Sequence, residues 1–323
     1  MNLPRRRFLQ LAAGAVALPA LSRGASALDY PARPVRIIIG FPAGGGPDIV
    51  TRLVAQSLSE RLGQQFIVEN RPGAGTNIAT EAVVRAPADG YTLLLVTGTN
   101  AFNTTLYDNL NFNFVRDIAP IALIGGAPFV MVVNPSVPAK TLLEFIAYAK
   151  ANPNKINMAS FGNGTAGHIF GERFKMMAGV DLVHVPYRGN PFPDLLGGQV
   201  QVFFVSIPPA LGYIQAGKLR ALAVTSAARQ EVLPDVATVG EFVPGYEASS
   251  WEGIGAPANT PTAIIERLNK EIDAGLAEAK LKARLTELSN PPMPMSVADF
   301  RKFIADETDK WGKVIRAANI KLG

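Results

Sequence analysis

Short apolar runs rich in β-branched residues alternate along this chain with segments of helical periodicity. Residues 35–39 have the composition of a buried strand, and residues 48–62 carry an apolar stripe typical of a helix that ends at Gly63. Strands are predicted next at 66–68 and 91–96, with a helical segment between them. This repeated strand–helix–strand order favours a parallel sheet with helices on both faces, so we expect an α/β protein.

The pattern restarts after a β-rich region at residues 121–133, and the chain is expected to enter a second lobe near residues 121–130 and to return near residues 246–256. A chain of 323 residues is expected to form two domains. We predict two α/β lobes, with residues 28–123 and 252–323 in lobe 1 and residues 124–251 in lobe 2. Two crossings would make a hinge with a cleft between the lobes. Two long amphipathic helices close the chain and are expected to pack on lobe 1.

Residues 1–27 have the layout of an export signal. Arg5–Arg7 form a basic start, residues 11–21 are apolar and uncharged, and Ala25–Ala27 offer the small residues of a cleavage site. The apolar run is shorter than the ~20 residues of a membrane span. We expect a twin-arginine-like signal peptide that is cleaved after Ala27, so that the mature protein lies in the periplasm. An ordinary Sec signal with extra arginines is the alternative.

Composition excludes several classes of function. The formal charge is +5, but four arginines and no acid lie in the predicted signal, so the expected mature chain carries +1. The high pI of about 9.4 is therefore poor evidence for nucleic-acid binding. The chain has no cysteine, which excludes disulfides, thiolate nucleophiles and cysteine-ligated metals. With two histidines in all, a histidine-rich metal site is not expected, and neither metal nor cofactor is predicted.

Two glycine-rich loops each connect a predicted strand to a predicted helix. Phe41–Asp48 contains three consecutive glycines, whose N–H groups could face an anion at the helix start. The alternative is a plain turn capped by Asp48, and no Walker lysine is present. Gly162–Gly167 has the literal spacing G-x-G-x-x-G of a dinucleotide site. Because Asp181 precedes the next strand and an exported protein meets little NAD(P), an anion-binding loop fits better.

Further polar candidates lie beside these loops. Thr97–Asn100 ends the third predicted strand, where ligands bind in open α/β sheets. His168 follows the second glycine loop and can donate to a ligand or to the backbone, and both possibilities stay open. His184 lies within an apolar strand and is interpreted as a core histidine. Since neither histidine has a serine and an acid in an obvious elbow, a catalytic triad is weakly supported.

Several strings across the chain resemble one family. They include YPARPVRII at residues 30–38, VENRPGAG at 68–75 and VHVPYRG at 183–189, with further matches at 41–45, 89–94, 194–200, 216–223, 233–236 and 311–314. Together they resemble the Bug-type receptors, the extracytoplasmic solute-binding components of tripartite tricarboxylate transporters. The resemblance implies a type II periplasmic-binding fold that closes on a carboxylate-bearing solute. Such receptors bind the carboxylate largely through backbone N–H groups and hydroxyls.

Carried over by position, the resemblance places first-lobe contacts in Phe41–Asp48 and Thr97–Asn100, and second-lobe contacts in Ser160–Thr165 with His168 behind them. The candidate ligand-binding residues are Phe41, Ala43, Gly44, Gly45, Gly46, Asp48, Thr97, Thr99, Asn100, Ser160, Gly162, Asn163, Gly164, Thr165, His168, Val205 and Ser206.

Two positions depart from the family pattern. Many relatives carry an aspartate at the end of the strand over residues 199–204, where this chain has Val205 and then Ser206. That acid could receive the ammonium of an amino acid, so its absence favours a solute without a cation. The segment Gly189–Asp194 is also shorter than usual, and we expect Phe192 to reach the rim of the cleft.

The sequence therefore predicts a non-enzymatic periplasmic receptor. It would capture a small organic carboxylate between its lobes and deliver it to the membrane subunits of a tripartite transporter, acting as a monomer with no nucleic-acid partner. A periplasmic enzyme with His168 as acid–base, or an orphan receptor that serves a signalling partner, are the alternatives.

Overall fold

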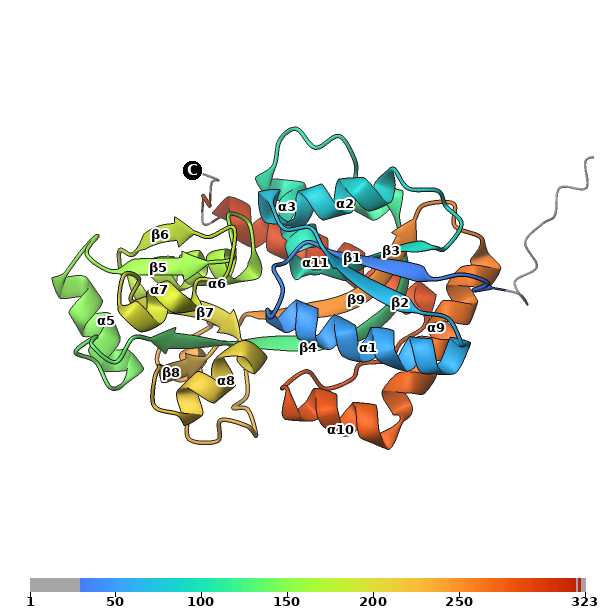
Figure 1. Cartoon of the computed structure of the whole chain (residues 1–323). Coiled ribbons are helices and arrows are strands. Elements are labelled where there is room, and N and C mark those ends of the chain that lie inside the picture. The colour runs from blue at the N-terminus through green and yellow to red at the C-terminus, as the bar shows by residue number, and fades with distance from the viewer. Residues whose placement is uncertain (1–29, 318, 321–323) are drawn as a thin grey trace, which may run out of the picture. The chain divides into compact units, whose positions relative to one another are not determined.

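The first group of strands is parallel, as the sequence pattern predicted. In a computed structural model that describes residues 30–317, 319 and 320, β1 (Val35–Ile39) lies between β2 (Phe66–Asn70) and β3 (Thr92–Thr97) (Figure 1). Helices α1 (Gly46–Leu62) and α2 (Asn77–Val84) connect them. Gly63 ends α1 in the left-handed conformation, as expected of a C-terminal glycine. The predicted signal peptide lies outside the described residues.

Two long strands carry the chain between the two groups. The segment 118–128 of β4 (Ile118–Val133) pairs with β9 (Ser249–Pro257) with two register shifts, and the last residues of β4 pair with β7 (Val202–Ser206) and β8 (Arg220–Val224). Strand β9 also pairs with β3. All of these pairings are antiparallel, so the prediction of a wholly parallel sheet was wrong at its centre. The reason is that β4 leaves the first group and β9 returns to it, which makes the two strands run in opposite directions.

The second group of strands is again parallel. Strand β5 (Asn157–Ser160) lies between β6 (Val183–Pro186) and β7. Helices of this group are α5 (Leu142–Ala151), α6 (Ala166–Ala178), α7 (Phe192–Gly197) and α8 (Ile207–Gln215). We call the elements around β1–β3 the first lobe and those around β5–β7 the second lobe. The residue boundaries predicted for the lobes stay a prediction.

Three helices follow β9, where the sequence predicted two. They are α9 (Thr262–Ala277), α10 (Ala279–Glu287) and α11 (Val297–Ala317). Helix α11 does not pack on the first lobe alone. Its Trp311 side chain packs on both Phe102 and Phe170, with ring centroids 4.9 and 5.3 Å away. Phe102 comes from α3 (Gly98–Leu106) and Phe170 from α6, so α11 joins the cores of both lobes.

The remaining short elements are α4 (Phe114–Asp117) and two 3-10 turns, η2 (Ala74–Thr76) and η3 (Val239–Glu241). Among residues 30–317, no helix has both the length and the apolar composition that a membrane span requires.

Candidate functional site

A small cavity lies where the two lobes meet. Its volume is about 30 Å³, which is the room of one or two water molecules. Five of the predicted site residues line it, namely Phe41, Thr97, Thr99, Thr165 and Ser206. Seven further residues complete the lining. Pro47, Phe161, Ala166 and Gly167 belong to loops that the sequence predicted, whereas Phe129, Ser250 and Glu252 lie outside them.

Three helices begin at this cavity. Thr97, Thr165 and Ser206 are the N-cap residues of α3, α6 and α8, and all three line it. The first N–H groups of a helix have no partner within the helix, and the helix dipole adds partial positive charge there. The dipoles of these three helices favour an anion in the cavity, and its N–H donors come mainly from α3 and α6, because Pro208 and Pro209 in the first turn of α8 carry no N–H. The sequence produces this arrangement because β3 and β7 end directly at Thr97 and Ser206.

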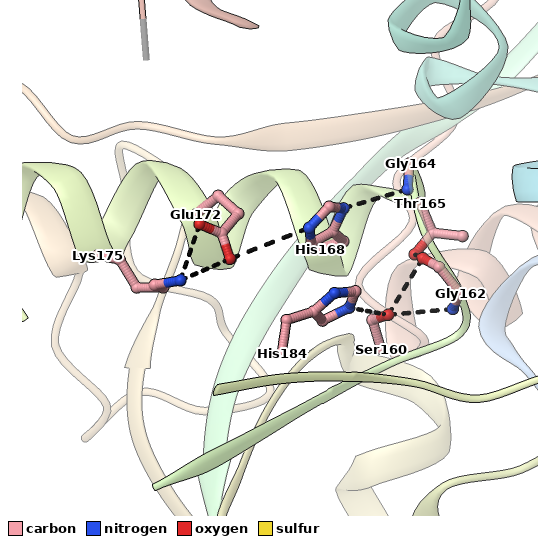
Figure 2. A network of polar contacts seen from close by, with 8 residues as sticks. All are labelled: Ser160, Gly162, Gly164, Thr165, His168, Glu172, Lys175 and His184. Atoms are coloured by element: carbon pink, nitrogen blue, oxygen red, sulfur yellow. Dashed lines mark hydrogen bonds and ion pairs between the residues drawn. The ribbon is translucent and has the colours of Figure 1, made fainter. Parts of the chain in front are cut away.

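The glycine loop before α6 uses most of its own N–H groups. Gly162 donates to Ser160 Oγ at 3.0 Å, Gly164 donates to His168 Nδ1 at 3.1 Å, and Thr165 donates to the Gly162 carbonyl at 3.3 Å (Figure 2). These three groups are thus engaged inside the loop. The expectation that the dense N–H groups of this loop face a ligand does not hold for them.

The donors that reach the cavity come from the next two residues. Ala166 and Gly167 line it at the start of α6. The Ala166 N–H donates to Thr99 Oγ at 3.2 Å, which is a hydrogen bond from the second lobe to the first. Thr99 is fully buried. A carboxylate placed here would meet donors from both lobes.

The two histidines support the loop from behind. Their rings stack with centroids 3.9 Å apart, and His184 Nε2 lies 2.6 Å from Ser160 Oγ (Figure 2). Burial lowers the pKa of His168 to about 3, with the charges of His184 and Lys175 adding to the effect. Burial, with Lys175, lowers the pKa of His184 to about 4. Both rings are therefore neutral near pH 7. His184 is less deeply buried than the sequence interpretation implied, and it shapes the loop.

His168 has a fixed role in this arrangement. Because its Nδ1 accepts the Gly164 N–H, the neutral ring carries its proton on Nε2, which lies 4.0 Å from a Glu172 carboxylate oxygen. His168 does not line the cavity, and it contacts the backbone as an acceptor and not as the predicted donor. An imidazole held in this way is poorly placed to exchange protons with a solute in the cavity.

Asp48 supports the first glycine loop. Its carboxylate accepts hydrogen bonds from the Gly44 N–H at 2.9 Å, Asn70 Nδ2 at 3.0 Å and Arg52 Nε at 3.0 Å. Burial alone would raise the pKa of this carboxyl, but the hydrogen bonds from Arg52, Gly44 and Asn70 outweigh burial and lower the pKa. Asp48 therefore fixes the loop and does not line the cavity.

The other residues of this loop differ in exposure. Ala43 and Gly44 are exposed, whereas Gly45 and Gly46 are buried. A Cβ on Gly46 would lie 2.2 Å from Ser206 Oγ, so the two lobes touch at this point. The lack of a side chain at Gly46 is what permits this close approach.

Other predicted residues lie away from the cavity. Asn100 caps α3 by accepting the Thr97 N–H at 2.8 Å and donates to Thr80 Oγ at 2.9 Å. Gly162 and Asn163 line a neighbouring pocket. Val205 is 1% exposed and packs in a core cluster of the second lobe.

Phe192 belongs to the same cluster, stacked on Tyr213 at 5.1 Å. The expectation that Phe192 reaches the rim of the cleft was wrong. The physical reason is that Tyr213 and the neighbouring core of the second lobe bury this ring.

Glu252 is the acid that the sequence reasoning missed. It is 2% exposed, lines the cavity from β9 and accepts a hydrogen bond from Asn290 Nδ2 at 3.0 Å. Burial raises the pKa of its carboxyl to about 7, although the Asn290 hydrogen bond acts in the opposite direction. The available signal was a single acid inside an apolar strand, residues 249–257, near the predicted return to lobe 1.

The rest of the lining is aromatic. Phe41, Phe129 and Phe161 contribute apolar surface beside the hydroxyl groups. Phe161 packs edge-on against Phe203 at 5.3 Å. Among the residues with a described placement, no group of three or more His, Asp or Glu side chains could hold a metal ion. The site thus combines anion-favouring helix ends, hydroxyls, one buried acid and an apolar wall.

Comparison with known proteins identifies the family. Residues 50–320 match the tripartite tricarboxylate transporter family receptor. The chain belongs to this family. It is 35% identical over 312 residues to the protein BugT of Bordetella pertussis, covering 95% of this chain and 96% of BugT. The predicted resemblance to Bug-type receptors is confirmed.

Solved structures agree in fold. An R. palustris protein, Rpa4515, solved with adipate, is 35% identical with a TM-score of 0.88, covering 91% of this chain and 99% of that one. MatC from Rhodopseudomonas palustris, solved with bound malate, is 29% identical with a TM-score of 0.84, covering 88% of this chain and 100% of that one. The periplasmic binding protein BugD is 33% identical with a TM-score of 0.87, covering 90% and 99%. The predicted periplasmic-binding fold class is confirmed.

Proposed function

We propose that this protein is an extracytoplasmic receptor that captures a small organic carboxylate in the cavity between its lobes. The observation that carries the proposal is the convergence of three helix N-termini, at Thr97, Thr165 and Ser206, on one cavity shared by both lobes. Family membership and the adipate and malate held by two relatives support the same class of solute.

The N–H groups of Ala166 and Gly167 and the hydroxyls of Thr97, Thr99 and Ser206 would hold the carboxylate. Several oriented donors can satisfy an anion without a buried cation. In this structure the Ala166 N–H donates to Thr99, so a bound carboxylate would take over or share that contact. Thr99 and Ala166 are adjacent across the lobes, and the solute would thereby stabilise their approach.

The small cavity supports a binding cycle that includes opening. Residues of both lobes line the cavity, and the lobes touch at Gly46 and Ser206, so the lobes would separate to admit a solute. A solute that contacts both lobes favours the closed state by population shift. We propose that the loaded receptor then docks on the membrane subunits of a tripartite transporter, in the periplasm and as a monomer.

We propose binding without turnover. Neutral, stacked His168 and His184 face the loop backbone and Ser160, so neither reaches the cavity as an acid or base. A dinucleotide in the Gly162–Gly167 loop is also disfavoured, because Gly162 and Gly164 engage their N–H groups internally.

The proposal is tested by a thermal-shift screen of the mature protein with monocarboxylates, dicarboxylates, tricarboxylates, aromatic acids and amino acids. A solute at 100 times its Kd should stabilise the protein by about 2.7 kcal/mol. Stabilisation by NAD or a metal, with none by any carboxylate, would contradict the receptor proposal. Turnover of a bound acid that is lost in His168→Ala would support an enzyme instead.

A further inference from the structure

Glu252 is a buried carboxyl group on the wall of the cavity. It lies in β9 opposite Thr97 of β3 and Gly125 of β4, where the two long strands pass between the lobes. Asn290, in the segment after α10, holds one carboxylate oxygen at 3.0 Å and is itself 2% exposed. The acid is thus fixed in place by an amide that carries no charge.

In the described part of the chain, no cation lines the cavity beside Glu252. Among the described residues that line the cavity with it, none has a titratable side chain. The adjoining groove shares Ser250 with the cavity and is not lined by Glu252, and its charged side chains are Arg173, Glu247, Glu307 and Lys310. Burial alone accounts for the raised pKa of the Glu252 carboxyl, which no charged neighbour opposes. An unpaired buried acid of this kind favours its neutral form.

We propose that Glu252 is a specificity-determining residue: it acts as a neutral acid that donates a hydrogen bond to the second carboxylate of a dicarboxylate solute, so that binding takes up a proton. The first carboxylate would lie at the helix N-termini beside Thr97, Thr165 and Ser206. This inference rests on the proposed function and names the part of the solute that Glu252 recognises.

The sign of the proton linkage follows from charge. A carboxylate beside Glu252 makes ionisation of Glu252 less favourable, so the bound state holds a proton that the free protein loses above neutral pH. Below about pH 6 the free acid is already protonated, so Glu252 adds no further pH dependence to the affinity there. Above pH 7 the affinity should fall by about tenfold per pH unit, as expected when one proton is taken up. A solute that presents an ammonium group to Glu252 would instead release a proton on binding.

The test is isothermal titration calorimetry of the mature protein with adipate, malate, succinate and glutamate at pH 5.5, 7.0 and 8.5. Each titration is repeated in two buffers of different ionisation enthalpy, which gives the number and direction of protons exchanged. The variant is Glu252→Gln, whose amide can donate a hydrogen bond but cannot titrate. The matched control is Asp273→Asn, because burial raises the pKa of Asp273 to about 6 but this residue does not line the cavity.

At pH 7.0 and 8.5 the inference predicts proton uptake with a diacid in the wild type and in Asp273→Asn, and none in Glu252→Gln, and the following outcomes refer to these two pH values. It is overturned if a diacid binds the wild type without proton uptake, or if the uptake persists in Glu252→Gln. Proton release with glutamate as the tightest solute would also overturn it. If Glu252→Gln does not fold, the wild-type buffer series still decides. In each of these results the solute still binds, so the receptor proposal survives, whereas failure of every acid to bind would contradict that proposal itself.

Discussion

Gly46 gives the sharpest test of how the lobes close. It lies at the start of α1 and is buried against the second lobe. In Gly46→Ala the new Cβ would lie 2.2 Å from Ser206 Oγ and 3.1 Å from Ser206 Cβ. The first of these contacts is more than 1 Å shorter than the 3.4 Å at which ordinary contact begins. The substitution should therefore hinder the approach of the lobes while each lobe keeps its own core.

The size of the effect follows from the cost of overpacking. Inserting a methyl group into a filled site costs about 1–3 kcal/mol. If this cost falls on the closed state alone, the Kd for the solute rises by about 5- to 150-fold. Ser206→Ala removes the oxygen nearest to the new methyl group, so the double variant should bind more tightly than the two single effects predict. This departure from additivity is the signature of direct contact.

The assay is isothermal titration calorimetry with the acid that gives the largest thermal shift. Gly212→Ala is the matched control, because a Cβ at Gly212 has no atom within 4 Å and the position lies in α8. The control should bind as the wild type does. Wild-type affinity in Gly46→Ala, or strict additivity with Ser206→Ala, would refute the account of closure.

Three further predictions concern the loop, the cavity and the core. Burial holds the pKa values of His168 and His184 at about 3 and 4, so each contributes stability that is lost as pH falls below 6.5. Glu252, whose pKa is raised, has the opposite effect on stability between pH 4.5 and 7. The measurement is therefore the difference in the free energy of unfolding in urea between wild type and His168→Gln. This difference should shrink towards pH 4. Thr99→Val removes the acceptor of the Ala166 N–H and should weaken solute binding by about 1–3 kcal/mol, measured by calorimetry; unchanged affinity would argue against this contact. Trp311→Ala should lower the free energy of unfolding by about 3–5 kcal/mol in urea titrations, and a loss below 1 kcal/mol would show that α11 does not join the lobes.

The strands of the first group were predictable because their signals are local, whereas β9 (Ser249–Pro257) was not predicted as a strand. The apolar run at residues 35–39 coincides with β1, and the predicted end of the first helix at Gly63 is its observed C-cap. Helix α10 was not predicted, because it is short and mostly polar, with Leu281 and Leu285 as its buried residues. The antiparallel centre of the sheet depends on the pairing of β4 with β9 and has no local signal.

The sequence predicted which loops form the site, but it was a weaker guide to which groups of those loops reach the cavity. A strand followed by a polar residue and then a helix predicted Thr97 and Thr165 as site residues, because helix N-termini gather at the carboxyl edge of a parallel sheet. The hydrogen bond from the Gly164 N–H to His168 depends on three-dimensional packing, so the spacing of the residues in the sequence did not predict it. Glu252 and Thr97 are 155 positions apart in the sequence, and the pairing of β3 with β9 brings them together at the cavity.

The central claim is that a carboxylate binds at the three helix N-termini between the lobes. A crystal structure of the mature protein, grown with the acid that stabilises it most in the thermal-shift screen, tests this directly. The account predicts a carboxylate within about 2.7–3.2 Å of the Ala166 or Gly167 N–H and of the Thr99 hydroxyl. A solute bound elsewhere, with the Ala166 N–H still donating to Thr99 and no carboxylate at the helix ends, would contradict it.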